Sequence, residues 1–233
     1  MSKVLCITAN PRPKEKSFSL KLAEAFMDEY RQLSKDDRIS NLDVYSDDIP
    51  LLDRDVLDCW DRLHGGCSIR DLDSQGQQKL KRIDELVDQF IEADKYVFVS
   101  PLWNLSIPPM LKAYIDTVCI AGKTFEYTAE GPRGLLQGKN AIHIQARGGI
   151  YSEGPMSEFE LGDRYLRSIL AFMGVTEIQS LVVEGMFQHP ERADEYLEEA
   201  KGKCRLAAEM LMRGGSVRPG GRSVERPGQH IHG

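Results

Sequence analysis

The sequence predicts an α/β fold in which helices cover both faces of a doubly wound, five-stranded parallel sheet. Short apolar runs alternate with segments of helical periodicity along most of the 233 residues. This alternation is typical of parallel strands joined by right-handed crossover helices. Hydrophobic residues make up 41% of the chain, which is enough to bury the core of one domain without disulfide or metal crosslinks.

Strands and helices are expected to follow one another in strict alternation. The strands are short apolar runs, at 4–8, 42–44, 96–99, 141–144 and 178–183. The helices are segments in which apolar residues recur every three or four positions, at 22–33, 80–91, 111–118, 165–173 and 191–212. Ser17 is placed to cap the first helix. The run at 96–99 is typical of a strand buried on both faces.

Three segments depart from this alternation. Residues 50–76 predict an irregular stretch that contains Trp60, and residues 125–136 predict a small hairpin. From Arg213 on, the chain is rich in glycine and proline and nearly lacks apolar residues. We therefore expect one α/β domain over 1–212 and a flexible tail over 213–233.

Composition excludes several classes of protein. The net charge of −6 provides no basic field for nucleic acid or anionic lipid, so no nucleic-acid partner is expected. No apolar run approaches the ~18 residues of a membrane span, and the N-terminus lacks a signal-peptide pattern. The five cysteines are scattered without a C-x-x-C pair, which predicts free thiols in the cytoplasm and no metal site.

The order of the elements also predicts where a ligand binds. Five alternating strands fit the order 2-1-3-4-5, the flavodoxin-like arrangement. Ligands of such sheets bind beyond the carboxyl ends of the strands, where the winding reverses. In this chain those ends are the loops 9–19, 101–108 and 147–154.

The first loop has the features of an anion site. It leads into a helix N-terminus, where free N–H groups and the hydroxyls of Ser17 and Ser19 are available. Arg12, Lys14 and Lys16 add local positive charge to an acidic protein. Neither a dinucleotide fingerprint nor a P-loop is present, so the expected ligand group is a single phosphate.

A phosphatase is a competing interpretation of this first loop. Cys6 and Arg12 have the C-x5-R spacing that a phosphatase uses to wrap its loop around a phosphate beside a thiolate nucleophile. However, the apolar strand continues past Cys6, which places the thiol inside the sheet. Pro11 and Pro13 also remove two of the N–H donors that such a cradle needs.

The other two loops suit a planar heterocycle. The second presents Trp103 and Asn104 in a turn bounded by Pro101 and Pro108, an aromatic wall beside a polar group. The third contains the pair Gly148-Gly149, where main chain can approach a ligand closely.

Taken together, these segments resemble the FMN-dependent azoreductase and quinone reductase family of flavodoxin-like NAD(P)H dehydrogenases. The resemblance extends from residue 1 to about residue 210. It rests on Ser17-Phe18-Ser19, Pro101-Leu102-Trp103-Asn104-Leu105, Ala146-Arg147-Gly148-Gly149, Lys112-Ala113-Tyr114-Ile115-Asp116, Gly122-Lys123-Thr124-Phe125-Glu126-Tyr127-Thr128 and Gly131-Pro132.

The resemblance implies a set of flavin contacts. The FMN phosphate site falls on Asn10, Ser17, Phe18 and Ser19. The contacts to the rest of the flavin fall on Pro101, Leu102, Trp103, Asn104, Leu105, Ala146, Arg147, Gly148 and Gly149. Tyr151 stands where some members have histidine, and it is expected to orient the electron acceptor.

The resemblance also implies an activity and an assembly. Such enzymes take hydride from NADH or NADPH and pass two electrons to a quinone or azo compound by a ping-pong mechanism. They are homodimers in which the partner subunit completes each FMN site, and the 50–76 segment and the helix near Glu158 are candidates for that contact. A non-enzymatic, flavodoxin-type electron carrier remains the alternative.

Overall fold

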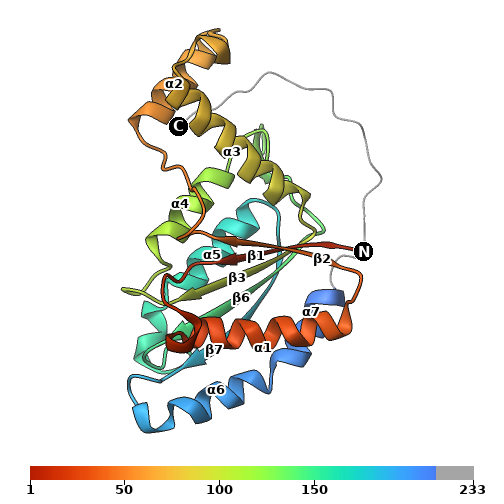
Figure 1. The fold of residues 1–233 in the computed structure, drawn as a ribbon, viewed down its shortest axis with the longest axis vertical. Coiled ribbons are helices and arrows are strands. Elements are labelled where there is room, and N and C mark those ends of the chain that lie inside the picture. The colour runs from red at the N-terminus through yellow and green to blue at the C-terminus, as the bar shows by residue number, and fades with distance from the viewer. Residues whose placement is uncertain (214–233) are drawn as a thin grey trace.

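The computed structural model describes residues 1–213, and its central feature is a five-stranded parallel sheet (Figure 1). The strand order is β2-β1-β3-β6-β7. The strands are β1 (Lys3–Thr8), β2 (Arg38–Asp43), β3 (Lys95–Pro101), β6 (Asn140–Arg147) and β7 (Glu177–Glu184). In order of appearance this is 2-1-3-4-5, so the predicted topology is confirmed.

Helices cover both faces of this sheet, as predicted. One face carries α1, α6 and α7, and the other carries α3, α4 and α5 (Figure 1). The helices are α1 (Phe18–Leu33), α2 (Arg54–His64), α3 (Ser74–Glu92), α4 (Pro109–Val118), α5 (Gly162–Phe172), α6 (Ala193–Lys201) and α7 (Cys204–Arg213). The 3-10 turns are η1 (Lys14–Lys16), η2 (Ile69–Asp71), η3 (Pro155–Phe159) and η4 (Pro190–Arg192). No helix within residues 1–213 is long and apolar enough to cross a membrane.

Two hydrophobic cores result, one on each side of the sheet. Phe26 and Tyr30 of α1 are fully buried against one face. Phe90 of α3, Tyr114 of α4 and Leu166 of α5 are fully buried against the other. The periodic residues of the predicted helices therefore point inward, as amphipathic helices require.

The prediction of an irregular segment over 50–76 is wrong. Residues 54–64 form α2, which begins where the Asp53 carboxylate accepts a hydrogen bond from the Val56 N–H. The helix packs on the first half of α3 through a third, small core that includes Val56 and Cys59. Trp60 packs against that core as a local anchor. Only one narrow stripe of α2 is buried, so its apolar signal in the sequence is weak.

Two other expectations differ in detail. The predicted last helix, 191–212, is two helices, because α6 ends at Lys201, is capped by Gly202, and is followed by α7 from Cys204. Glycine inside a helix costs about 1 kcal/mol relative to alanine, which favours a break there.

The predicted hairpin is present as β4 (Phe125–Thr128) and β5 (Gly131–Gly134). Arg213 still belongs to α7, and the remaining residues of the expected tail, 214–233, lie outside the described residues.

Candidate active site

A cavity of about 110 Å³ lies at the carboxyl edge of the sheet, where the three predicted loops meet. The loops come together because β1, β3 and β6 are parallel neighbours, so their carboxyl ends share one edge. The predicted site residues that line this cavity are Asn10, Ser17, Phe18, Ser19, Pro101, Leu102, Trp103, Ala146 and Gly148.

The first loop is held by hydrogen bonds among three buried polar side chains. The Asn10 amide Nδ2 donates to Ser17 Oγ over 2.7 Å and to Ser19 Oγ over 3.1 Å. Ser17 Oγ accepts from the Leu20 N–H over 3.2 Å, so its predicted role as the cap of α1 is confirmed. Both hydroxyls are therefore fixed on the first turn of α1, where helix N–H groups lack intrahelical acceptors.

Two of the three cations that the sequence placed near this loop line the cavity. They are Arg12 and Lys16. Lys14 instead pairs with Glu24, with 2.6 Å between Nζ and Oε1. A helix N-terminus flanked by two cations is well suited to bind an anionic group such as a phosphate, even in a protein of net charge −6.

The second loop has a strained main chain. Asn104 and Leu105 have positive φ angles of 46° and 70°, a conformation that leucine rarely adopts. The turn is closed by Trp103 and Ser106, which exchange two main-chain hydrogen bonds of 2.9 Å. Such strain persists only where the surroundings impose it, and it is common at ligand-binding sites.

Asn104 does not line the 110 Å³ cavity. It borders a neighbouring cavity of about 470 Å³, together with Trp103 and Tyr165. Trp103 lines both cavities. The second loop therefore contributes residues to the lining of both cavities.

In the third loop the Arg147 side chain points into the protein. It is buried, and its Nε donates to Gln145 Oε1 over 2.6 Å. The carboxylates of Glu184 and Glu160 lie 3.5 Å and 3.8 Å from its guanidinium nitrogens. These contacts compensate the buried positive charge of the guanidinium group. Because the side chain points inward, Arg147 presents its main chain at the edge of the sheet.

Tyr151 lies over Gly149, beside the cavity rather than in its lining. The Tyr151 N–H donates to Glu184 Oε2 over 3.0 Å. Its ring atom Cε2 lies 3.2 Å from the position that a Cβ on Gly149 would take. The phenol is half-buried.

The loop after β7 contributes residues that the sequence analysis missed. Met186 and Phe187 line the cavity, and the Phe187 N–H donates to the Gly148 carbonyl over 2.8 Å. The Phe187 side chain is 77% exposed. A signal was available in the sequence, since a glycine, Gly185, follows the fifth strand and indicates a turn at the same edge of the sheet.

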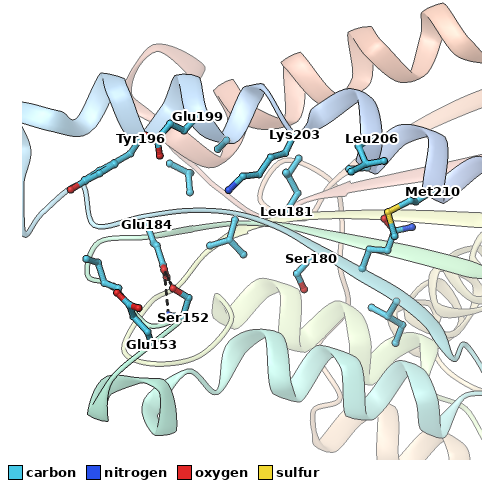
Figure 2. A pocket seen from close by; sticks show the side chains of 17 residues that line it. Ser152, Glu153, Ser180, Leu181, Glu184, Tyr196, Glu199, Lys203, Leu206 and Met210 are labelled. Atoms are coloured by element: carbon cyan, nitrogen blue, oxygen red, sulfur yellow. Dashed lines mark hydrogen bonds between the residues drawn. The ribbon is translucent and has the colours of Figure 1, made fainter.

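A larger groove of about 770 Å³ runs along the outer edge of β7, between that strand and the α6–α7 pair (Figure 2). Leu206 and Met210 point into it from α7 and Lys203 from the turn before it, and Glu184 and Ser152 close one end. None of the predicted site residues lines this groove. Size alone therefore does not identify the functional site of this fold.

The buried position of Cys6 argues against the phosphatase interpretation. Cys6 lies in the middle of β1 and is 4% exposed. Burial raises the pKa of its thiol to about 11, whereas a thiolate nucleophile needs a lowered pKa. Cys6 is a structural residue of the core around α1.

Comparisons with known proteins agree with this geometry. A family model described as a flavodoxin-like fold matches residues 2–206. An FMN-dependent NADH:quinone oxidoreductase of Staphylococcus haemolyticus is 50% identical over 195 residues, which are 84% of this chain and 92% of the relative. The FMN-dependent NADH:quinone oxidoreductase 3 of Halalkalibacterium halodurans is 51% identical over 199 residues, 85% of this chain and 94% of that one.

Solved structures give the same result. An azoreductase from Bacillus anthracis is 39% identical, with a TM-score of 0.82, over 89% of this chain and 99% of the other. An FMN-dependent NADH-azoreductase of the same species, solved in complex with FMN, is 33% identical, with a TM-score of 0.84, over 91% and 99% of the two chains.

Proposed function

We infer the function of this chain from its family, because it belongs to the flavodoxin-like FMN-dependent NADH:quinone oxidoreductases. The chain is an FMN-dependent oxidoreductase that passes electrons from NADH to quinones and azo compounds. The observation that carries this assignment is the convergence of three loops and the N-terminus of α1 on one cavity. The relatives described above are oxidoreductases and azoreductases, and none of them supports the alternative of a flavodoxin-type electron carrier.

We propose that the first loop holds the FMN phosphate. Ser17 and Ser19 offer hydroxyls fixed by Asn10, and Arg12 and Lys16 offer positive charge at the same cavity. Hydrogen bonds and charges of this kind suit a phosphate dianion. In this proposal Phe18 supplies main-chain N–H at the first position of α1.

We propose that the second and third loops hold the flavin ring. Pro101, Leu102, Trp103, Asn104 and Leu105 form one side of the site, and Ala146, Arg147, Gly148 and Gly149 form the other. Apolar walls with a few fixed polar groups are typical of cofactor sites. When bound, FMN supplies the hydride and electron transfer chemistry, and the protein supplies orientation and electrostatics. We propose that donor and acceptor use the same open face in turn, with NADH or NADPH as the donor.

Tyr151 is proposed to orient the acceptor by donating its phenol hydrogen to an acceptor oxygen as that oxygen gains charge. Such donors act mainly in the transition state. Tyr151→Phe is therefore expected to slow reoxidation of the reduced enzyme by quinone about tenfold, or ~1.4 kcal/mol, and to leave reduction by NADH unchanged. Stopped-flow measurement of each half-reaction makes the test. Equal reoxidation rates in the two proteins would leave Tyr151 as a packing residue over Gly149.

We propose that the enzyme is a homodimer whose FMN site lies at the subunit interface. In support, Met156, Phe159 and Leu161 are 41%, 49% and 44% exposed on a segment beside the second loop. Apolar side chains gathered beside a ligand cavity are typical of interaction surfaces. The Leu161 N–H donates to the Leu105 carbonyl, so this surface is continuous with the site. A monomer in sedimentation at micromolar concentration would contradict the proposal.

The cytoplasm is the proposed compartment. All five cysteines are free thiols, as a reducing compartment requires, and Cys6, Cys59 and Cys204 are buried. A disulfide found after thiol trapping in intact cells would count against this location.

The function is tested most directly on the purified protein. The preparation is expected to be yellow, and heating is expected to release FMN, which chromatography separates from FAD. With NADH as donor and menadione as acceptor, the protein is expected to catalyse steady-state turnover. A colourless protein that neither binds added FMN nor oxidises NADH would contradict the assignment.

A further inference from the structure

A chain of buried polar side chains connects the first turn of α5 to the second loop. His143 of β6 is fully buried, and its Nδ1 lies 2.9 Å from Asp163 Oδ1. Its Nε2 lies 2.9 Å from Ser100 Oγ. Ser100 is also fully buried, and it directly precedes Pro101, the residue at which β3 ends and the second loop begins. The chain therefore runs from Asp163 through His143 to the base of the loop.

Asp163 is anchored firmly enough to act as the fixed end. Burial alone would raise the pKa of its carboxyl, yet hydrogen bonds from His143, Arg167 and Ser180 hold that pKa well below its usual range. Arg167 Nε and Ser180 Oγ each lie 2.7 Å from its oxygens. A charged carboxylate beside Nδ1 fixes the orientation of the imidazole and directs Nε2 at Ser100.

The same turn of α5 contacts the second loop at two further points. The Leu161 N–H donates to the carbonyl of Leu105, one of the two strained residues of that loop, over 2.9 Å. Gly162 lies so close to the loop that a Cβ on it would be 3.0 Å from Leu102 Cδ1. The turn therefore lies against the loop at Leu102 and at Leu105.

The connectivity of Ser100, His143 and Asp163 matches that of a nucleophilic triad, but the arrangement is not one. Ser100 and His143 are 0% exposed, so no substrate reaches the hydroxyl. A connection that is buried and leads to a strained loop acts on the loop's conformation instead.

We propose that Asp163, acting through His143 and Ser100, is a positioning residue that holds the loop 101–105 in the conformation that binds FMN. The inference rests on the proposed function, in which that loop holds the flavin ring. It adds residues from β6 and α5 to the apparatus of the site. None of the three lines the cavity where the loops meet.

The test compares variants that each lose one hydroxyl. Ser100→Ala cuts the connection to the loop. Ser180→Ala removes a hydroxyl from the same Asp163 carboxylate, which Arg167 and His143 still hold, and it does not touch the loop. Thr117→Val removes a fully buried hydroxyl of α4, which bonds to the carbonyls of Pro50 and Ala113. The two controls account for loss of carboxylate contacts and for general loss of stability.

Ser100→Ala is expected to weaken FMN binding to the apoprotein about tenfold, measured by quenching of flavin fluorescence, while both controls stay within about twofold. Asp163→Asn is expected to weaken binding as well, and its effect should not add to that of Ser100→Ala, because the two residues act in series. Wild-type affinity in Ser100→Ala, an equal loss in Ser180→Ala, or additive effects would overturn the proposal.

Hydrogen exchange in the apoprotein provides a readout that does not depend on flavin. The amides of Ser106 and Leu161 close and anchor the second loop, and their exchange is expected to accelerate in Ser100→Ala but not in Ser180→Ala. Unchanged exchange would overturn the positioning role. If the wild-type protein bound no FMN, the proposed function would fail, while this measurement would still decide the role of Ser100.

Discussion

Gly148→Val is expected to reduce the affinity for FMN about 100-fold, or ~2.7 kcal/mol, and to leave the fold intact. The reason is steric, because a Cβ on Gly148 would lie 2.5 Å from Cδ2 of the Phe187 ring. Gly148 does not have a positive φ, so the main-chain angles themselves would accept another residue. The added side chain must displace Phe187 or enter the cavity where the three loops meet.

The measurement is the Kd for FMN of the apoprotein, together with the melting temperature and circular dichroism. Gly65→Ala is a suitable control, because Gly65 ends α2 with a φ of −71° and its Cβ would have no neighbour closer than 3.4 Å. Adding Phe187→Ala to Gly148→Val separates the two sources of crowding, since recovery of binding would assign the loss to Phe187. Wild-type affinity in the single variant would show that the flavin does not lie against this loop.

The second large effect is expected from the two cations of the first loop. Replacing Arg12 and Lys16 by alanine together should also weaken FMN binding about 100-fold, because each charged hydrogen bond to a phosphate contributes about 1.5 kcal/mol or more. Both side chains are exposed, so the loss should shrink as the salt concentration rises. Lys14→Ala is the matched control, since Lys14 pairs with Glu24 and does not line the cavity.

Riboflavin makes this test specific for the phosphate. It has the flavin ring without the phosphate, so its affinity should be the same in the double variant and in the wild type. An equal loss for riboflavin and FMN would mean that the substitutions disturb the loop as a whole. An unchanged FMN affinity would mean that the phosphate lies elsewhere.

Parts of the site were predictable from the sequence because they follow strand ends. The loops after β1, β3 and β6 each begin where an apolar run stops, and parallel strands bring those ends to one edge. Ser17 was predictable as a cap, because the side chain of a serine directly before an amphipathic helix accepts a hydrogen bond from a main-chain N–H of the first turn. Such signals depend on neighbouring residues alone, so one sequence is enough to find them.

Other features depend on contacts between residues far apart in the chain. Phe187 joins the cavity through a hydrogen bond to Gly148, 39 positions away. Gly185 indicates a turn after the fifth strand, but the local sequence does not indicate that this turn contacts Gly148. The inward turn of Arg147 depends on Glu160 and Glu184, which come from two other elements. Local pattern shows that a side chain is charged, but the position of its partners decides where it points.

The sequence alone is enough to predict the fold class, the strand order and the edge that carries the site, because hydrophobic periodicity and strand ends are local properties. It did not determine α2, whose single buried stripe gives little apolar signal, or the connection from Asp163 through His143 to Ser100. That connection spans three elements and exists only once β3, β6 and α5 have packed together. Burial then makes the polar contacts specific, because leaving a polar group unpaired in the core costs about 1–3 kcal/mol, whereas water pairs with the same group at the surface.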